Sequence, residues 1–176
     1  MGMKEMSDNI EITYADENDV PIIMEIIKNA KTRVPDPAWY CADDEDFVRS
    51  HIKEEGFILK AVIEGVLAGF LTVRYPKRAE DNLGVYLQLP DDEMMQVAHM
   101  ETAAVRPEYT GRGIQKRLMG RGEEVVRETS CCHYLMATAH PENVYSVNNI
   151  SKLGYEVVAE DMKYGGMPRY VFCKKI

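Results

Sequence analysis

The residues best suited to carry chemistry lie in segment 105–115, which reads VRPEYTGRGIQ. A strand-like apolar run ends there, and an amphipathic helical pattern begins directly after Gly113. The first amides of a helix lack acceptors within the helix, and the helix dipole adds partial positive charge at that end. Glycines at 111 and 113 let the backbone bend closely around an anion, although an ordinary strand-to-helix turn uses glycine too. The segment therefore predicts a pyrophosphate-binding turn, which four basic side chains would reinforce: Arg106, Arg112, Lys116 and Arg117.

Two side chains in the strand before this turn could accept a proton. His99 and Glu101 are two residues apart, so both should point to the same face of that strand. A lysine-like amine has a pKa near about 10.4, so an amine nucleophile needs a group that removes its proton at neutral pH. We take Glu101 as the predicted general base and His99 as the second candidate. The alternatives are a solvated carboxylate and a histidine that is packed or hydrogen-bonded in the interior.

A second polar group of residues follows the next strand-like segment. Asn143 and Ser146 open a short helical pattern, and His140 is expected to shape the turn before it. Tyr145 and Tyr155 lie in the same stretch and carry hydroxyls that could donate a proton. Each tyrosine could equally be a partly buried aromatic residue, so its role depends on where its hydroxyl points.

The charge of the chain is unevenly distributed. The net charge is −8; residues 1–100 contain 10 Lys and Arg against 20 Asp and Glu, and residues 101–176 contain 11 against 9. A nucleic-acid-binding protein would normally show a dominant basic face, so this class is disfavoured. The distribution suits a cationic substrate and an anionic cofactor, or simply a well-solvated surface. The acidic residues expected to attract a cation are Asp43, Asp44, Asp91, Asp92 and Glu93.

The cysteines give no sign of a metal site. The four are Cys41, Cys131, Cys132 and Cys173, without a CxxC pair or a histidine at metal-ligand spacing. Reduced thiols of this kind are typical of a cytoplasmic protein. No apolar run approaches the ~20 residues that span a bilayer, and no secretory signal is visible, so no membrane association is expected.

Hydrophobic periodicity predicts one mixed α/β domain over residues 1–176. Strands are predicted at 10–14, 57–63, 67–75, 97–105, 134–139, 155–159 and 169–173. Helices are predicted at 19–31, from the acidic run 43–46 to Gly56, at 114–128, and from Asn143 to Gly154. The resulting order is β-α-α-β-β-β-α-β-α-β-β. An irregular insertion at about 76–95 is typical either of a binding loop or of surface padding.

Two segments in this order resemble the GNAT superfamily of acyl-CoA-dependent N-acyltransferases. The turn at 105–115 is similar to the family's Val-x-Pro-x-Tyr-Arg-Gly-x-Gly-Ile-Gly. The family's second signature, Asn-x-x-Ala/Ser followed by Gly-Phe/Tyr, is matched at its usual spacing by Asn143, Ser146 and Gly154-Tyr155. The resemblance covers nearly the whole chain and implies a single-domain, mixed, mostly antiparallel central sheet flanked by helices.

The resemblance also implies acetyl-CoA as the cofactor and assigns residues to it. The strand backbone at Ala103, Ala104 and Val105 would pair with the pantetheine arm. Asn143 and Ser146 would contact the cofactor from the far side. The pyrophosphate would be held by the turn residues Thr110, Gly111, Arg112, Gly113, Ile114 and Gln115.

Three positions depart from the family pattern. Thr110 stands where the family has Arg or Gln, and Gln115 stands where it has Gly or Ala, so CoA affinity could be reduced. Ile150 occupies the position of a tyrosine that often protonates the departing thiolate, and isoleucine cannot donate a proton. Tyr145 and Tyr155 are the nearby candidates to replace it. A thiol with a pKa near ~8.5 does not strictly require an acid, so the loss weakens the mechanism without abolishing it.

These observations predict an enzyme that moves the acetyl group of acetyl-CoA to a primary amine by direct attack. The predicted acceptor is a small cationic molecule, and a protein or peptide amine is the first alternative. An alternative of another class is a catalytically silent domain that binds acyl-CoA and regulates a partner, which Thr110 and Ile150 favour. The resemblance is also compatible with a homodimer.

Overall fold

The central sheet of the computed structural model contains seven strands within the described residues 9–40, 43–163 and 166–176. The strands are β1 (Ile10–Tyr14), β2 (Gly56–Ile63), β3 (Val66–Arg74), β4 (Val97–Val105), β5 (Tyr134–Ala139), β6 (Glu156–Lys163) and β7 (Met167–Lys175). Their order is β1-β2-β3-β4-β5-β7-β6, and all neighbours are antiparallel except β4 and β5. The predicted mixed, mostly antiparallel sheet is confirmed. Cys41 lies outside the described residues.

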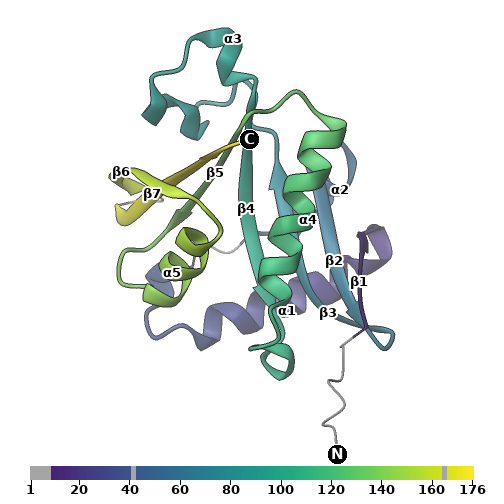
Figure 1. Ribbon diagram of the computed structural model, residues 1–176. Helices are drawn as coiled ribbons and strands as arrows, with labels where there is room; N and C mark the ends of the chain where they lie inside the picture. The colour runs from purple at the N-terminus through teal and green to yellow at the C-terminus, as the bar shows by residue number, and fades with distance from the viewer. Residues whose placement is uncertain (1–8, 41–42, 164–165) are drawn as a thin grey trace, which may run out of the picture.

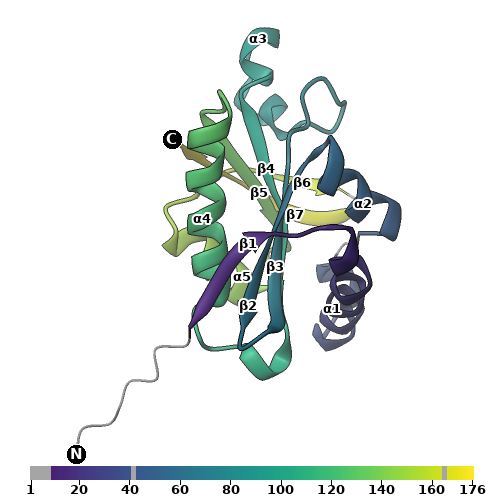
Figure 2. The same cartoon turned by 90° about the vertical axis from the view of Figure 1, so that its right-hand side faces the viewer.

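Helices cover both faces of this sheet (Figure 1). The helices of the described chain are α1 (Val20–Arg33), α2 (Glu45–Lys53), α3 (Asp91–Met94), α4 (Ile114–Thr129) and α5 (Val144–Lys152). Helices α1 and α2 lie on one face, and α4 and α5 lie on the other (Figure 2). Strand β3 serves both cores, because Phe70 packs with the first pair and Leu71 packs with the second. This double burial explains why β3 is apolar at successive positions instead of alternating.

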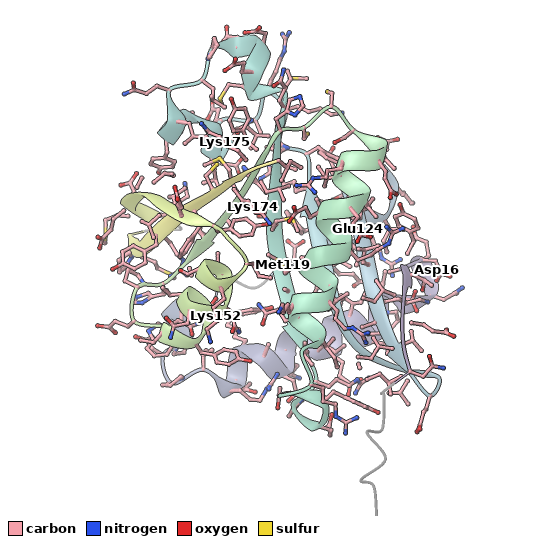
Figure 3. All side chains as sticks on the ribbon, in the orientation of Figure 1. Asp16, Met119, Glu124, Lys152, Lys174 and Lys175 are labelled. Atoms are coloured by element: carbon pink, nitrogen blue, oxygen red, sulfur yellow. The ribbon has the colours of Figure 1, made fainter. Side chains whose placement is uncertain are left out.

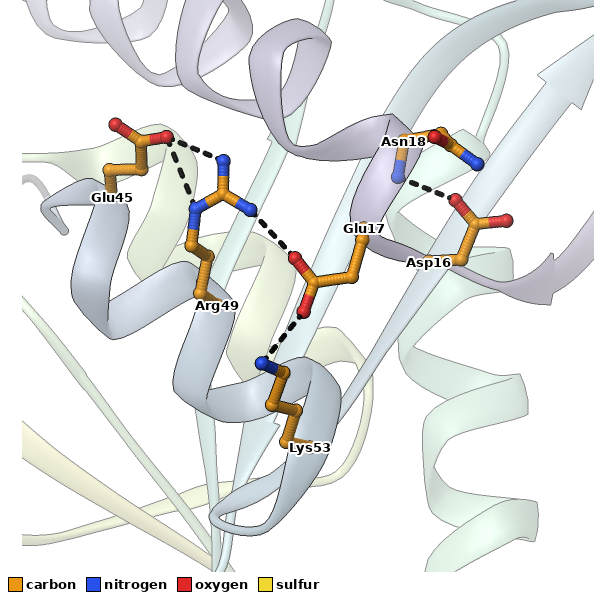
Figure 4. A network of polar contacts seen from close by, with 6 residues as sticks. All are labelled: Asp16, Glu17, Asn18, Glu45, Arg49 and Lys53. Atoms are coloured by element: carbon orange, nitrogen blue, oxygen red, sulfur yellow. Dashed lines mark hydrogen bonds and ion pairs between the residues drawn. The ribbon is translucent and has the colours of Figure 1, made fainter.

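A polar network fixes α2 against the turn that precedes α1 (Figure 4). Glu17, in that turn, accepts a hydrogen bond from Arg49 at 2.6 Å and lies 3.2 Å from the Nζ of Lys53. The carboxylate of Asp44 accepts a backbone N–H of the first turn of α2 at 2.8 Å and so caps the helix. These contacts hold the start of α2, and with it Asp43, in place beside the sheet.

The insertion at 76–95 has a defined structure that the sequence pattern did not reveal. It contains the turn η3 (Leu83–Leu87) and the short helix α3. Asn82 is completely buried, and its amide donates to the carbonyls of Lys77 at 2.9 Å and Met94 at 3.0 Å. One buried side chain therefore ties the two ends of the insertion together.

Strands β4 and β5 are joined only near their beginnings and then diverge (Figure 1). The parallel pairing is confined to Val97–His99 of β4 and the first half of β5. Beyond His99, β4 remains paired with β3 alone, so its other edge is open. This opening in the middle of the sheet positions the functional site.

Two of the three described cysteines are buried free thiols. They are Cys132 and Cys173, whereas Cys131 is exposed. Burial raises the pKa of both buried thiols, which keeps them protonated and unreactive at neutral pH. None of the helices in the described chain is long and apolar enough to cross a bilayer.

Candidate active site

The opening between β4 and β5 leads into a cavity of about 600 Å³, called here the main cavity. On one face of the sheet its walls include Met119 of α4 and Lys152 of α5 (Figure 3). On the other face the wall comes from the segment between α1 and α2, which contributes Trp39 and Asp43. The main cavity therefore connects the two faces of the sheet.

The glycine turn before α4 forms one end of the main cavity. Gly111 and Gly113 have φ angles of 80° and 72°, a conformation that side chains with a Cβ rarely adopt. The amides of Gly113, Ile114 and Gln115 precede Arg117, whose N–H donates to the first acceptor of the helix, the carbonyl of Gly113, and no acceptor for these three amides lies within the described residues. The side chain of Lys116 also lines the cavity here. This arrangement can bind an anion.

Among the residues 110–115 that were predicted to hold the pyrophosphate, Arg112 alone is absent from the described cavity walls. Its guanidinium lies over the ring of Tyr109, 5.1 Å from the ring centroid. Thr110 does line the cavity, and its hydroxyl donates to the carbonyl of Pro107 at 2.9 Å. The turn therefore offers the backbone and Lys116, not Arg112, to an anion.

The open edge of β4 forms the middle of the main cavity. Ala103, Ala104 and Val105 line it, and each of them pairs with β3 on its other side. The carbonyl of Val105 accepts a hydrogen bond from Arg33 of α1 at 3.0 Å. An open strand edge presents N–H and C=O groups to an extended ligand that carries amides.

Asn143 and Ser146 border the cavity opposite β4. Asn143 caps α5, because its Oδ1 accepts the N–H of Ser146 at 3.3 Å. His140, just before them, accepts the N–H of Glu142 at 3.1 Å and stacks on Trp39. The predicted role of His140 in shaping this turn is confirmed, and the ring stack also joins the two faces of the sheet.

Glu101 lies at a bulge in β4 and lines the main cavity. Met100 pairs with Val73 and Thr102 pairs with Thr72, so Glu101 is the extra residue on its strand. Its side chain retains 20% of its exposure. A substrate in the cavity can therefore reach the predicted general base.

His99 does not line the main cavity. It is 3% exposed, and its Nε2 accepts the backbone N–H of Leu83 at 3.0 Å. Its Nδ1 lies 3.4 Å from Oε2 of Glu101. Because Nε2 acts as an acceptor, the ring proton of the neutral form belongs on Nδ1, facing the carboxylate. His99 thus supports Glu101 instead of taking a proton from a ligand in the main cavity.

A second cavity of about 210 Å³ meets the main cavity at Glu101, which lines both. Arg74 and Asp81 line the second cavity and form a two-pronged ion pair at 2.8 and 2.9 Å. Beside it, Tyr86 of the insertion donates to Asp161 of β6 at 2.5 Å. The insertion is therefore anchored to two strands where it closes over this cavity.

Asp43 is a cavity residue whose position the sequence did not reveal. Its Oδ2 accepts a hydrogen bond from the Thr102 hydroxyl at 2.6 Å. Burial raises the pKa of Asp43 to about 6; the Thr102 hydroxyl opposes this rise, and the negative charges of Glu101 and Asp44 add to it. The run 43–46 looks uniform in sequence, and only the contact with β4 distinguishes Asp43.

The candidate proton donors differ sharply in position. Ile150 is buried in the wall of the main cavity at the place where the family pattern has tyrosine. Tyr155 is 4% exposed and does not line the cavity, and burial raises the pKa of its hydroxyl. Tyr145 lines the cavity and is 68% exposed. The suggestion that Tyr155 donates a proton to the thiolate is therefore wrong. For Tyr145 the same role stays a prediction.

The other predicted acidic residues lie elsewhere. Asp91, Asp92 and Glu93 form the first turn of α3 and line neither cavity, and Asp44 caps α2. Of the five acidic residues expected to attract a cation, Asp43 alone belongs to the described cavity walls. Within the described ranges, no three His, Cys, Asp or Glu side chains gather as a metal site would require.

Comparison with known proteins agrees with this architecture. The model of the acetyltransferase (GNAT) family matches residues 22–155. No curated protein sequence matches the chain.

Many solved structures have the same fold, including the following three. Arabidopsis thaliana NAA60 in complex with acetyl-CoA has a TM-score of 0.73 at 15% identity, over 96% of this chain and 99% of that one. The ribosomal-protein-alanine N-acetyltransferase of Brucella melitensis has a TM-score of 0.72 at 20% identity, over 94% and 99%. Salmonella typhimurium yncA with acetyl-CoA has a TM-score of 0.69 at 20% identity, over 95% and 94%.

The family match covers most of the chain, including the glycine turn, the open edge of β4 and the Asn143 signature. The element order and the sheet agree with the structural neighbours over nearly their full lengths. The chain belongs to the acetyltransferase (GNAT) family, whose members are acyl-CoA-dependent N-acyltransferases.

Proposed function

We propose that this protein transfers the acetyl group of acetyl-CoA to the primary amine of a small cationic molecule. One observation carries the proposal: the unpaired amides at the start of α4, the open edge of β4 and the carboxylate of Glu101 all belong to the walls of one cavity. These three features supply an anion site, an amide-pairing site and a proton acceptor along one path.

Acetyl-CoA fits the donor groups that this path offers. The amides of the turn at 110–115 and the Lys116 ammonium would hold the pyrophosphate. The edge formed by Ala103, Ala104 and Val105 would pair with the amides of the pantetheine arm. Asn143 and Ser146 would contact it from α5. When bound, acetyl-CoA supplies an activated acyl group with a thiolate as the leaving group.

Glu101 is the proposed general base. It would take one proton from the acceptor ammonium, which leaves a neutral amine as the nucleophile. A C–N bond then forms at the acyl carbon, the C–S bond breaks, and the thiolate is protonated. The overall reaction converts an ammonium and a thioester into an amide, a thiol and a proton. Tyr145 is the proposed donor to the thiolate.

A calorimetric titration with acetyl-CoA tests the cofactor half of this proposal. Gly113→Glu should abolish binding, because the new carboxylate would occupy the anion site. Gly65→Glu is the matched control, since Gly65 also has a positive φ, of 78°, but lies in an exposed hairpin turn with open space where a side chain would begin. Loss of binding in both variants, or in neither, would contradict the assignment.

Thiol release with a panel of primary amines tests the transfer half. Amine-dependent release is expected from a protein that binds acetyl-CoA. Binding without release on any amine would instead favour the silent regulatory domain, which the isoleucine at position 150 also favours.

A peptide α-amine is the second candidate acceptor. Two of the similar proteins are named as ribosomal-protein-alanine N-acetyltransferases, from Brucella melitensis and Escherichia coli. An α-amine has a pKa near about 8, so it demands less of a base than a lysine-like amine does. Including an alanine-initiated peptide in the amine panel separates the two candidates by their kcat/KM.

A further inference from the structure

We propose that Asp43 selects the acceptor: it places a second carboxylate next to Glu101, and the ammonium of a primary alkylamine binds between the two. This inference rests on the proposed acetyl transfer and goes beyond it, because it names the residue that makes the acceptor site selective for a cation. Asp43 acts in binding, whereas Glu101 takes the proton.

Glu101 and the contact that holds Asp43 both lie in one short stretch of β4. Thr102 follows Glu101 in the chain, and its hydroxyl donates to Oδ2 of Asp43 at 2.6 Å. The bulge at Glu101 interrupts the regular alternation of side chains at this point. Both carboxylates line the main cavity, and the charge of Glu101 acts on Asp43. They are therefore near neighbours from two elements, β4 and the segment before α2.

His99, whose Nδ1 lies 3.4 Å from Oε2 of Glu101, is the basic side chain that contacts this pair of carboxylates in the described part of the chain. No Lys or Arg nitrogen there lies within 4 Å of Asp43 or Glu101, and Asp43 is contacted by the neutral hydroxyl of Thr102. Arg74, whose charge acts on Glu101, is already paired with Asp81. Two partly desolvated like charges are costly until a cation joins them. An ammonium between them would offset that cost and donate hydrogen bonds to both.

The cavity wall beside Asp43 suits the carbon part of such an amine. Trp39 and Tyr40 line it shortly before Asp43 in the chain. The Trp39 ring is held by its stack on His140, with 5.8 Å between the ring centroids. An aromatic wall next to a carboxylate pair fits an alkylammonium, whose chain is apolar and whose head is charged.

The surrounding titratable groups are consistent with an anionic Asp43 at working pH. Burial raises the pKa of Asp43 to about 6, and Glu101 and Asp44 are the charged groups that raise it further. The basic groups elsewhere in the cavity wall are Arg33, Lys116, Lys152 and Arg169. None of these four contributes to the pKa shift of Asp43. Asp43 is therefore free to respond to a bound ammonium above pH 6.

The test compares a charged and an uncharged amine of similar shape. Benzylamine is an ammonium at neutral pH, and aniline is neutral there. With acetyl-CoA saturating, Asp43→Asn should lower kcat/KM for benzylamine by about tenfold or more, mainly through KM. The same variant should change kcat/KM for aniline by less than about twofold, because aniline brings no charge to the pair.

Asp44→Asn is the matched control. It removes the same charge one residue away, outside the cavity, and asparagine caps a helix as well as aspartate does. Its benzylamine kinetics should match the wild-type protein. Thermal unfolding and acetyl-CoA titration of each variant verify that it folds and binds the cofactor.

The outcomes separate the inference from the proposed function. If the wild-type protein acetylates benzylamine and Asp43→Asn does so with unchanged kcat/KM, the inference is overturned and the acetyl transfer stands. If Asp43→Asn loses benzylamine and aniline turnover equally, selection by charge is overturned as well. If the wild-type protein binds acetyl-CoA but acetylates no amine, the proposed function fails and the inference fails with it.

Discussion

The Nδ1 atom of His99 lies 3.4 Å from Oε2 of Glu101, while the Nε2 atom of the same ring accepts the backbone N–H of Leu83. Leu83 belongs to the insertion, so a backbone amide of the insertion fixes which ring nitrogen carries the proton. That proton then faces the proposed base. Under the proposed function His99 is a positioning residue, because its side chain links the insertion to Glu101.

Replacing His99 with alanine should therefore lower kcat without changing the affinity for acetyl-CoA. We expect a drop of about tenfold, because Glu101 would lose the group that orients it. The variant should also be less stable by about 1–3 kcal/mol, since the buried N–H of Leu83 loses its acceptor. Steady-state kinetics and denaturant unfolding measure the two effects. His133→Ala, at an exposed position, is the control. A His99→Ala enzyme with unaltered kcat would refute the positioning role.

Removing the proposed base should have a larger and purely kinetic effect. Glu101→Gln should reduce kcat about 100-fold or more, because glutamine keeps the shape but cannot take the ammonium proton. Raising the pH should partly restore the rate, since more of the amine is then neutral. Glu93→Gln, in the first turn of α3 and outside both cavities, should behave as wild type. A kcat of Glu101→Gln within twofold of the wild-type value would mean that another group is the general base.

The ionised side chain of Asp43 should lower the free energy of unfolding, and the size of this effect should depend on pH. Its pKa rises from 3.8 to about 6 on folding, so the folded protein holds the proton more tightly than the unfolded chain between these values. The free energy of unfolding therefore falls as the pH rises from 3.8 to about 6, and the penalty is fully present above pH 6. Asp43→Asn should raise the Tm at pH 8 by about 2–6 °C, and the gain should shrink at pH 4. Thermal melts at both pH values, with Asp44→Asn alongside, check this; a lower Tm at pH 8 would contradict it.

Tyr145 should matter to the departure of the thiolate. Tyr145→Phe is expected to lower kcat about tenfold if the hydroxyl donates the proton, with little change in stability because the side chain is largely exposed. Tyr14, another exposed tyrosine, is the control for the same substitution. Unchanged turnover in Tyr145→Phe would mean that solvent protonates the thiolate.

The sequence predicted the regular elements well because their signals are local. The predicted bounds of β1, β4 and β5 agree with the structure, and α4 extends one residue further than expected. The turn before α4 was also predictable, since glycine at 113 and an immediate helix start are both visible in the sequence.

Features that depend on contacts between distant segments were not predictable. The insertion acquires its structure from Asn82, whose amide reaches across to Met94. Asp43 resembles the other acidic residues around it until Thr102 is placed against it. Tyr155 carries a suitable hydroxyl, but packing buries it away from the cavity. The bulge at Glu101 likewise needs the register with β3, which no local pattern encodes.

The main cavity passes between β4 and β5 from one face of the sheet to the other, and this has a consequence for the order of events. Under the proposed function, the thioester donor would enter beside α4 and α5, and the amine would enter beside Asp43. Neither substrate would block the entrance of the other. Both can then be bound at once. Double-reciprocal plots of the initial rate, measured at several fixed concentrations of the other substrate, should therefore give intersecting lines, as in a sequential ternary-complex mechanism. No acetylated form of the protein should accumulate.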